Sequence, residues 1–185
     1  MNEQERFWSG DFGNDYLRRN QVDWTARIPF WADVIGTTGA RSVHEVGCNA
    51  GWNLSAIRSP YPDVQLSGND LNESAVAQAR SAGLRAFVGR EICPSEMIFT
   101  SGVLIHVAPE YLAETMRSIV DASYRYVLAI EYEADKEEEI EYRGHTGKLW
   151  RRPFGKLYQD MGLNLVKEWD SGPAFDRCTA WLLEK

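Results

Sequence analysis

The stretch SVHEVGCNAGWN, from Ser42 to Asn53, decides the fold of this chain. Its first five residues, 42–46, predict a short buried strand; Gly47 and Gly51 then interrupt it, and a helix-compatible run begins at Trp52. A glycine-rich turn between a strand and a helix lets the backbone approach a ligand and points free N–H groups at it. The stretch predicts a corner that binds an anion or a nucleotide; the alternative is a strand–helix turn that binds nothing.

A second predicted strand, QLSGND, ends at Asp70, about twenty residues beyond this turn. A carboxylate in that place accepts hydrogen bonds from both hydroxyls of a ribose, and the alternative is a carboxylate that caps the next helix. Asn49 stands where the dinucleotide fingerprint has its middle glycine, and Asn tolerates a positive φ better than most residues. Because the G-x-G-x-x-G spacing is absent, we do not expect a pyrophosphate ligand.

The composition predicts a single globular domain with a sizeable core. The chain has 185 residues, of which 44% are apolar and 25% charged, and its net charge of −7 disfavours wide non-specific binding to nucleic acid or anionic membrane. The three cysteines form no C-x-x-C pair, which argues against a disulfide framework and a zinc site and for a reducing compartment. With no apolar run near ~18 residues and a polar N-terminus, we expect a cytoplasmic protein without a bound metal.

The remaining chain alternates predicted strands and helices and closes with two consecutive strands. This order predicts a parallel sheet with one antiparallel member. In residues 3–20 two glycines are expected to interrupt any helix, and Pro29 predicts a kink or a restart in the helical pattern that follows. Asn72 is the expected N-cap of the helix after Asp70. The second strand, which ends at Asp70, is expected at 64–70, and further strands are expected at 84–88, 96–103, 126–130, 163–169 and 178–183.

The Glu45-x-Gly47-x-Asn49-x-Gly51 turn followed by Asp70 resembles motif I of the class I methyltransferases that depend on S-adenosylmethionine. The resemblance covers roughly residues 40–185 and implies a Rossmann-like α/β fold: a seven-stranded, mostly parallel sheet with helices on both faces and one antiparallel strand. It implies S-adenosylmethionine as cofactor and S-adenosylhomocysteine as product. It also implies one domain, 1–185, with residues 1–40 as a helical, aromatic cover and a charged insertion near 134–154 in the core, 41–185.

Three blocks narrow the resemblance to the small bacterial methyltransferases associated with pseudaminic acid biosynthesis. They are FWSGDFGNDYLRRN (7–20), EVGCNAGWNL (45–54) and FTSGVLIHVAPEYL (99–112). The resemblance assigns cofactor contacts to Glu45, Gly47, Cys48, Asn49, Gly51, Trp52, Asp70, Leu71, Glu91, Ile92, Thr100, Ser101 and Gly102. For Glu45 and Trp52 a purely structural place in the turn or the core remains the alternative.

His106 is the candidate general base, because it lies just past the strand that ends beneath the expected methyl group and its reference pKa is near ~6.5. The alternative is a histidine that caps a helix or lines the pocket. The acceptor is expected to meet two segments outside the cofactor core, which carry Trp8, Tyr16, Arg19, Asn20, Arg143, His145, Arg151 and Arg152. The alternatives are aromatic residues that pack across the domain and arginines that offset the neighbouring acidic run.

The leading function is a methyltransferase, monomeric or homodimeric, that acts on a small polar and anionic acceptor such as a sugar acid or a nucleotide sugar. A guanidinium pairs bidentately with a carboxylate or phosphate, which favours an anionic acceptor. A second hypothesis is O- or N-methylation of a protein, peptide or natural product. A third, of another class, is a module that binds S-adenosylmethionine without catalysis.

Overall fold

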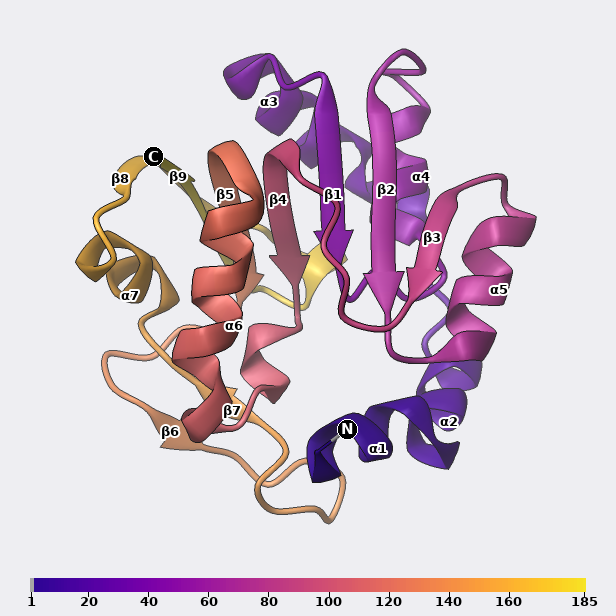
Figure 1. The fold of residues 1–185 in the computed structure, drawn as a ribbon, viewed down its shortest axis with the longest axis vertical. Coiled ribbons are helices and arrows are strands. Elements are labelled where there is room, and N and C mark those ends of the chain that lie inside the picture. The colour runs from indigo at the N-terminus through magenta and orange to yellow at the C-terminus, as the bar shows by residue number, and fades with distance from the viewer. Residues whose placement is uncertain (1) are drawn as a thin grey trace. The chain divides into compact units, whose positions relative to one another are not determined.

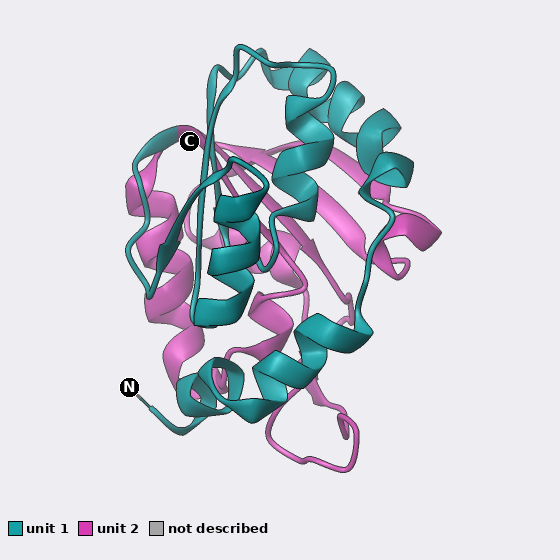
Figure 2. Ribbon diagram, turned by 90° about the vertical axis from the view of Figure 1, so that its right-hand side faces the viewer, with its two compact units in different colours: residues 1–95 teal, residues 96–185 magenta. Residues whose placement is uncertain are grey.

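Seven strands form one sheet in the order β3-β2-β1-β4-β5-β9-β8, and helices flank it (Figure 1). The computed structural model describes residues 2–185, which divide into two compact units, one up to Ser95 and one from Glu96 to Lys185 (Figure 2). Strand β9 runs antiparallel to both of its neighbours, β5 and β8. The predicted α/β sheet with one antiparallel strand is confirmed.

The first unit begins with helices and continues with three parallel strands. Its elements are α1 (Glu3–Ser9), α2 (Asp11–Arg19), the 3-10 turn η1 (Trp24–Arg27), α3 (Ile28–Thr38), β1 (Ser42–Val46), α4 (Trp52–Arg58), β2 (Gln65–Asp70), α5 (Glu73–Ser81) and β3 (Arg85–Val88).

The N-terminal segment is more helical than its glycines predict. Gly10 separates α1 from α2, but Gly13 lies inside α2, so the expectation that both glycines interrupt the helix is wrong. A Cβ at Gly13 would lie 1.8 Å from the carbonyl oxygen of Trp8 and 2.9 Å from the side-chain nitrogen Nδ2 of Asn72. Glycine is therefore required at this position by the close approach of α1 and the start of α5, not by a helix break.

Helix α3 restarts at the proline, as expected. Pro29 is its second residue, where a missing N–H costs nothing because the first N–H groups of a helix have no intrahelical partner. Gly36 lies within the helix, and Gly39, in the left-handed conformation with φ 62°, ends it.

The register of the parallel strands brings the predicted site residues to one edge of the sheet. Val46, the last residue of β1, pairs with Asn69 of β2, and Asp70 pairs with Val88 of β3. The carboxyl ends of these three strands therefore meet beside the turn that follows β1.

The second unit carries the other strands of the sheet and a small hairpin. Its elements are β4 (Ser95–Ser101, with Ser95 at the boundary), the 3-10 turn η2 (Leu104–His106), α6 (Pro109–Ala122), β5 (Ser123–Glu131), β6 (Glu138–Glu139), β7 (Trp150–Arg151), α7 (Phe154–Asp160), β8 (Asn164–Asp170), the 3-10 turn η3 (Pro173–Phe175) and β9 (Thr179–Glu184).

Strand bounds in this unit differ from the sequence-based expectation: β4 ends at Ser101, two residues before the predicted end at 103. Strand β5 extends to Glu131, one residue past the predicted end, because its last residue still pairs with Thr179 of β9. The charged insertion folds back as the two-stranded sheet β6–β7, in which Glu138 pairs with Arg151 and Glu139 with Trp150. The insertion is thus an ordered hairpin, anchored by the buried side chain of Trp150.

Candidate functional site

The turn after β1 has the left-handed backbone that its sequence predicts. The φ angles of Gly47, Asn49 and Gly51 are 72°, 48° and 79°. Gly51 is constrained by space as well, since a Cβ there would lie 2.2 Å from Cδ1 of Leu84. The shape of the turn therefore depends on its own glycines and asparagine and on the packing of Leu84 against Gly51.

The Asp70 carboxylate joins this turn to the end of β2. Its Oδ2 accepts a hydrogen bond from the backbone N–H of Asn49, and its Oδ1 accepts one from the N–H of Asn72, each at 2.8 Å. Burial raises the pKa of Asp70, and the backbone N–H groups oppose this shift. The backbone N–H of Leu71 contributes as well, and because a carboxylate has about four lone-pair positions, Asp70 keeps acceptor capacity for a ligand hydroxyl.

The cap of α5 comes from Asn72 and not from Asp70. The Asn72 side chain accepts a hydrogen bond from the N–H of Ala75 at 2.9 Å, as the sequence predicts. The same side chain donates to Oδ1 of Asn14 at 3.0 Å, which ties α2 to the loop after β2. The cap residue is thus Asn72, and Asp70 accepts a hydrogen bond from the backbone N–H of that cap residue.

A buried carboxylate lies at the start of the turn with one oxygen unpaired. Glu45 is 2% exposed, and its Oε1 accepts a hydrogen bond from Nδ2 of Asn53 at 2.7 Å. Its Oε2 has no hydrogen-bond partner within the described residues 2–185. Burial raises the pKa of Glu45 to about 8, against the opposing effect of Asn53. An unpaired buried carboxylate oxygen is costly unless a donor meets it, so this atom is suited to a cationic ligand group.

Two residues beside Glu45 were not predicted from the sequence. Nη1 of Arg27 donates to Oδ1 of Asn53 at 2.8 Å, so Arg27, Asn53 and Glu45 form a continuous polar chain. Asn53 could have been predicted from the sequence, because it places a side-chain amide at the second residue of the helix after the turn. Arg27 lies in an otherwise aromatic segment, and only the packing of η1 against α4 brings it here.

The other residues that follow these strands are arranged around the turn. Cys48 is buried, and Trp52 is partly buried against the cluster of Leu17, Ala50 and Ala75. Leu71 is partly buried directly after Asp70. Trp52 therefore packs as a core residue, which is the structural alternative named for it. Because Leu17 of α2 belongs to the same cluster, the N-terminal segment also packs against the domain, as its structural alternative has it.

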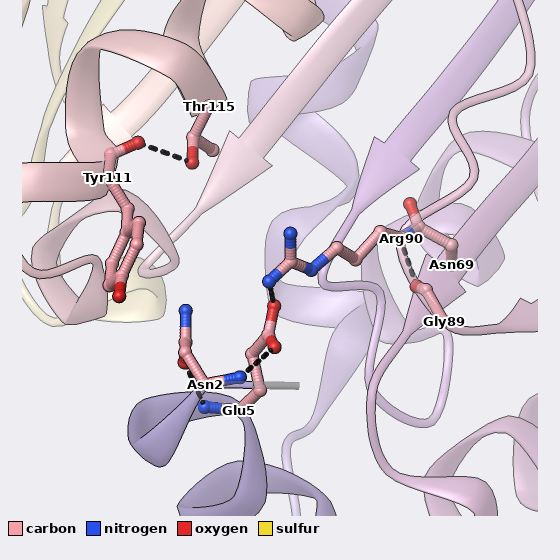
Figure 3. A network of polar contacts seen from close by, with 7 residues as sticks. All are labelled: Asn2, Glu5, Asn69, Gly89, Arg90, Tyr111 and Thr115. Carbon is pink, nitrogen blue, oxygen red and sulfur yellow. Dashed lines mark hydrogen bonds and ion pairs between the residues drawn. The ribbon is translucent and has the colours of Figure 1, made fainter.

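The loop after β3 carries the residues expected to frame an adenine, and it is tied to α1. Arg90 forms an ion pair with Glu5, and Oε2 of Glu5 also accepts a hydrogen bond from the backbone N–H of Asn2 at 2.6 Å (Figure 3). The next residues are Glu91, which is exposed, and Ile92, which is partly buried. The ion pair fixes the loop immediately before the expected adenine contacts.

His44 is a structural residue in a buried hydrogen-bond chain. Its Nδ1 lies 2.8 Å from Oγ of Ser67, and its Nε2 lies 2.9 Å from Oδ1 of Asn69. Nδ2 of Asn69 donates to the carbonyl of Gly89 at 2.7 Å, which is drawn in Figure 3. Because a carbonyl only accepts hydrogen bonds, the side-chain amide of Asn69 must direct its NH2 group to Gly89 and its Oδ1 to His44. Oδ1 also only accepts, so Nε2 of His44 carries the proton.

The aromatic residues of the N-terminal segment form one cluster. The ring of Trp8 contacts Phe12 and Tyr16 edge to face, with centroids 5.4 Å apart in each pair. The Arg19 guanidinium lies over the same two partners, 4.8 Å from the Phe12 centroid and 5.6 Å from that of Tyr16. Asn20 ends α2. The structure thus brings Trp8 and Arg19 to the ring of Tyr16.

In the second unit, β4 ends at the residues expected beneath a methyl group. Thr100 is buried, whereas Ser101 and Gly102 are partly buried, and Gly102 has φ 66°. The N–H of Gly102 donates to the carbonyl of Ile130 at 2.8 Å, which places the turn η2 beside the end of β5.

His106 is held in one orientation and one tautomer. Its Nδ1 lies 2.6 Å from the carbonyl oxygen of Lys148, and its ring centroid lies 5.1 Å from that of Tyr142. A carbonyl only accepts, so Nδ1 carries the proton and Nε2 is the acceptor nitrogen. Burial lowers the pKa of His106 to about 4, which keeps the imidazole neutral near pH 7. A neutral imidazole with a defined acceptor nitrogen can take a proton from a nucleophile, and the lowered pKa makes it a weaker base than a free imidazole.

The four basic candidates of the insertion divide into two kinds. Arg143, His145 and Arg151 are exposed, and the Arg143 guanidinium lies 5.9 Å from the centroid of the Tyr142 ring. Arg152 is 1% exposed, and its Nε donates to Oε2 of Glu137 at 2.7 Å. Of the four acceptor candidates in the insertion, three therefore lie on the surface and Arg152 does not.

Within residues 2–185, the structure shows no group of three or more His, Cys, Asp or Glu side chains that could hold a metal ion. In the same residues, each helix falls short of the length or the apolar character that crossing a bilayer requires.

Comparisons with known proteins relate the chain to methyltransferases by structure alone. No protein-family model matches the sequence, and no curated protein matches it. The magnesium protoporphyrin IX methyltransferase ChlM of Synechocystis PCC 6803, with bound S-adenosylmethionine, matches with a TM-score of 0.72 at 13% identity, over 100% of this chain and 98% of that chain. The same enzyme is also known with bound S-adenosylhomocysteine.

Two further structures extend this likeness. Human N-acetylserotonin methyltransferase in complex with S-adenosylmethionine matches with a TM-score of 0.76 at 15% identity, over 100% of this chain and 59% of that chain. The sugar N-methyltransferase KedS8 from Streptoalloteichus sp. ATCC 53650 matches with a TM-score of 0.69 at 12% identity, over 95% of this chain and 93% of that chain. The chain therefore has the Rossmann-like fold of the class I S-adenosylmethionine-dependent methyltransferases.

Proposed function

We propose that this protein is a methyltransferase that uses S-adenosylmethionine and acts on a small, polar and anionic acceptor. The observation that carries the proposal is the turn after β1, in which Asp70 keeps acceptor positions and the buried Glu45 has one unpaired oxygen. These two carboxylates match the two hydrogen-bond-donating parts of the cofactor, the ribose hydroxyls and the ammonium group of its methionine part.

The residues around the turn fit the cofactor in a defined way. Asp70 holds the ribose, Glu45 holds the ammonium group, and Arg27 lies close enough to the polar chain to neutralise the carboxylate of the methionine part. The proposal keeps the other expected contacts: Gly47, Cys48, Asn49, Gly51, Trp52, Leu71, Glu91, Ile92, Thr100, Ser101 and Gly102.

The cofactor supplies a methyl group already activated on a sulfonium, so the protein need only align the acceptor, exclude water and remove a proton. His106 takes that proton at Nε2, because its Nδ1 is committed to the carbonyl of Lys148. Its lowered pKa keeps this nitrogen unprotonated at neutral pH.

The acceptor is proposed to meet basic and polar side chains and aromatic rings. In the insertion these are Arg143, His145 and Arg151, and in the N-terminal segment they are Trp8, Tyr16, Arg19 and Asn20. Guanidinium groups favour a carboxylate or a phosphate on the acceptor. We therefore propose a sugar acid or a nucleotide sugar, in keeping with the resemblance to methyltransferases associated with pseudaminic acid biosynthesis.

Other acceptors and a non-catalytic role are the competing functions. The similar structures include enzymes for a porphyrin, for N-acetylserotonin and for a sugar, so the fold does not choose among acceptors. Incubation with methyl-labelled S-adenosylmethionine and fractionated metabolite extracts tests the proposal. We expect label in small anionic metabolites; label only in proteins or peptides would favour the second hypothesis, and binding without any transfer would favour a binding module.

A further inference from the structure

A buried carboxylate holds the turn that carries His106 from one side. Glu131, the last residue of β5, is 0% exposed. Its Oε1 accepts hydrogen bonds from the backbone N–H groups of Val103 and Leu104, each at 3.2 Å, and its Oε2 accepts one from Ile105 at 3.3 Å. The three backbone N–H groups immediately before His106 thus all donate hydrogen bonds to one side chain.

A buried guanidinium holds the same turn by its carbonyl groups. Nη1 of Arg152 donates to the carbonyl oxygen of Leu104 at 3.1 Å and to that of Val107 at 3.0 Å. Arg152 follows β7 directly, so it belongs to the base of the charged hairpin. The peptide groups on both sides of His106 are therefore tied to two buried side chains: the guanidinium of Arg152 and the carboxyl group of Glu131, whose pKa burial raises to about 7.

The hairpin also sets the orientation of the imidazole itself. The carbonyl of Lys148 accepts from Nδ1 of His106, and the ring of Tyr142 lies against the ring of His106. The backbone of His106 and its side chain are thus both fixed by the same insertion.

We propose that Glu131 and Arg152 are positioning residues that hold His106 so that its Nε2 faces the acceptor as a base. The inference rests on the proposed function, since it assigns His106 the role of base. It gives Arg152 a different task from the contact with the acceptor that its sequence position suggests, because its Nη1 already serves the turn and its Nε serves Glu137.

The choice of charged side chains for this task is physically informative. A turn on a protein surface needs no buried ions, and burying a charge costs free energy unless hydrogen bonds meet it. Here the Glu131 carboxyl group accepts from three peptide N–H groups and Nη1 of Arg152 donates to two peptide carbonyls, all within the stretch 103–107, which favours precise placement over general stability.

The tautomer of His106 is the direct readout. The chain contains three histidines, so nitrogen-15 NMR of the labelled protein gives three imidazole spin systems, assigned with the variants His44→Gln, His106→Gln and His145→Gln. We expect the Nδ1–H form for His106 and the Nε2–H form for His44. A His106 with its proton on Nε2, or with averaged tautomers, in the parent protein would overturn the proposal.

Variants then test the two positioning residues. We expect Arg152→Gln and Glu131→Gln to convert His106 to averaged tautomers and to reduce label transfer into a metabolite extract about 10- to 100-fold. Arg152→Lys should retain part of the Nδ1–H signal, because one ammonium can donate to both carbonyls. Arg117→Gln and Glu114→Gln, on the exposed face of α6, are the matched controls and should retain the parent's tautomer.

The outcomes separate this inference from the proposed function. An unchanged His106 signal in folded Arg152→Gln and Glu131→Gln contradicts the positioning role, whether or not methyl transfer occurs. If either variant does not fold, the tautomer of His106 in the parent protein and in Arg152→Lys tests the positioning role. Absence of cofactor binding by the parent, with an intact Nδ1–H signal, contradicts the proposed function alone.

Discussion

The Oδ2 atom of Asp70 accepts a hydrogen bond from the backbone N–H of Asn49 at 2.8 Å, so the end of β2 and the turn after β1 share one anchor. The two residues are far apart in sequence, and parallel pairing of β1 with β2 brings them together. Because Asn49 has φ 48°, its N–H is directed by the left-handed turn and not by a strand or helix. The shape of the turn and the placement of the carboxylate thus depend on each other.

The stability of this corner should depend on the absence of a side chain at position 51. Gly51→Ala combines φ 79° with a Cβ 2.2 Å from Cδ1 of Leu84, so we expect it to lower the free energy of unfolding by about 1–3 kcal/mol. Gly36→Ala is the control: at this exposed residue of α3 no atom lies within 4 Å of the place that a Cβ would take, and the change should stabilise by about 0.5–1 kcal/mol. Urea unfolding measures both, and equal effects would contradict the account of the turn.

The folded protein should lose stability in acid partly through His106. Its pKa is lowered to about 4 from an ordinary value of 6.5, so between these pH values the unfolded chain binds a proton that the folded state does not. The contribution of this histidine is therefore fully present above about pH 6.5 and is lost as the pH falls towards 4.

Urea unfolding at a series of pH values tests this. We expect the free energy of unfolding of His106→Gln to fall less between pH 6.5 and pH 4.5 than that of the parent. His145→Gln, at an exposed position, should follow the parent. The same slope in His106→Gln and the parent would mean that burial does not keep this imidazole neutral.

Cofactor binding should release a proton from Glu45. Burial raises the pKa of Glu45 to about 8, so the side chain is mostly protonated at pH 7, and an ammonium group placed against it favours the carboxylate. Calorimetry in two buffers with different ionisation enthalpies counts the proton. We expect release of close to one proton with S-adenosylmethionine, and much less with 5′-methylthioadenosine, which lacks the ammonium group, or with Glu45→Gln. The same proton count for the parent and Glu45→Gln would exclude this pairing.

The exposed arginines of the hairpin should govern the acceptor and not the cofactor. Replacing Arg143 and Arg151 together by Gln should raise the acceptor KM about 10-fold, with the KM for S-adenosylmethionine nearly unchanged. Added salt should weaken acceptor binding more in the parent than in the double variant. Arg117→Gln controls for the loss of a surface charge, and acceptor kinetics that match the parent's in the double variant would refute this role.

The sequence predicted the parts of the fold that depend on local chemistry. The turn at 47–51, the N-cap Asn72 and the closing antiparallel strand follow from glycine, capping and alternation patterns, and the structure confirms each. The contacts of individual site residues with cofactor and acceptor remain predictions.

What the sequence did not predict depends on contacts between distant segments. Arg27 joins the polar chain of Glu45 only because η1 packs on α4, and Glu131 is one residue past the predicted end of its strand. Arg152 looked like a surface cation in a charged run, yet its place after β7 buries it under the turn of His106. Gly13 shows the same limit, since the Trp8 carbonyl and the Asn72 side chain that approach it explain a glycine within a helix.

Calorimetric titration with S-adenosylmethionine, comparing the parent with Asp70→Ala, tests the central claim most directly. The account predicts that the parent binds and that Asp70→Ala, checked for folding by circular dichroism, binds more weakly by about 1–3 kcal/mol through the loss of hydrogen bonds to the ribose. Asp63→Ala, which removes an exposed carboxylate before β2, should bind like the parent. No binding by the parent, or equal affinity in the parent and Asp70→Ala, would contradict the assignment of this corner as the cofactor site.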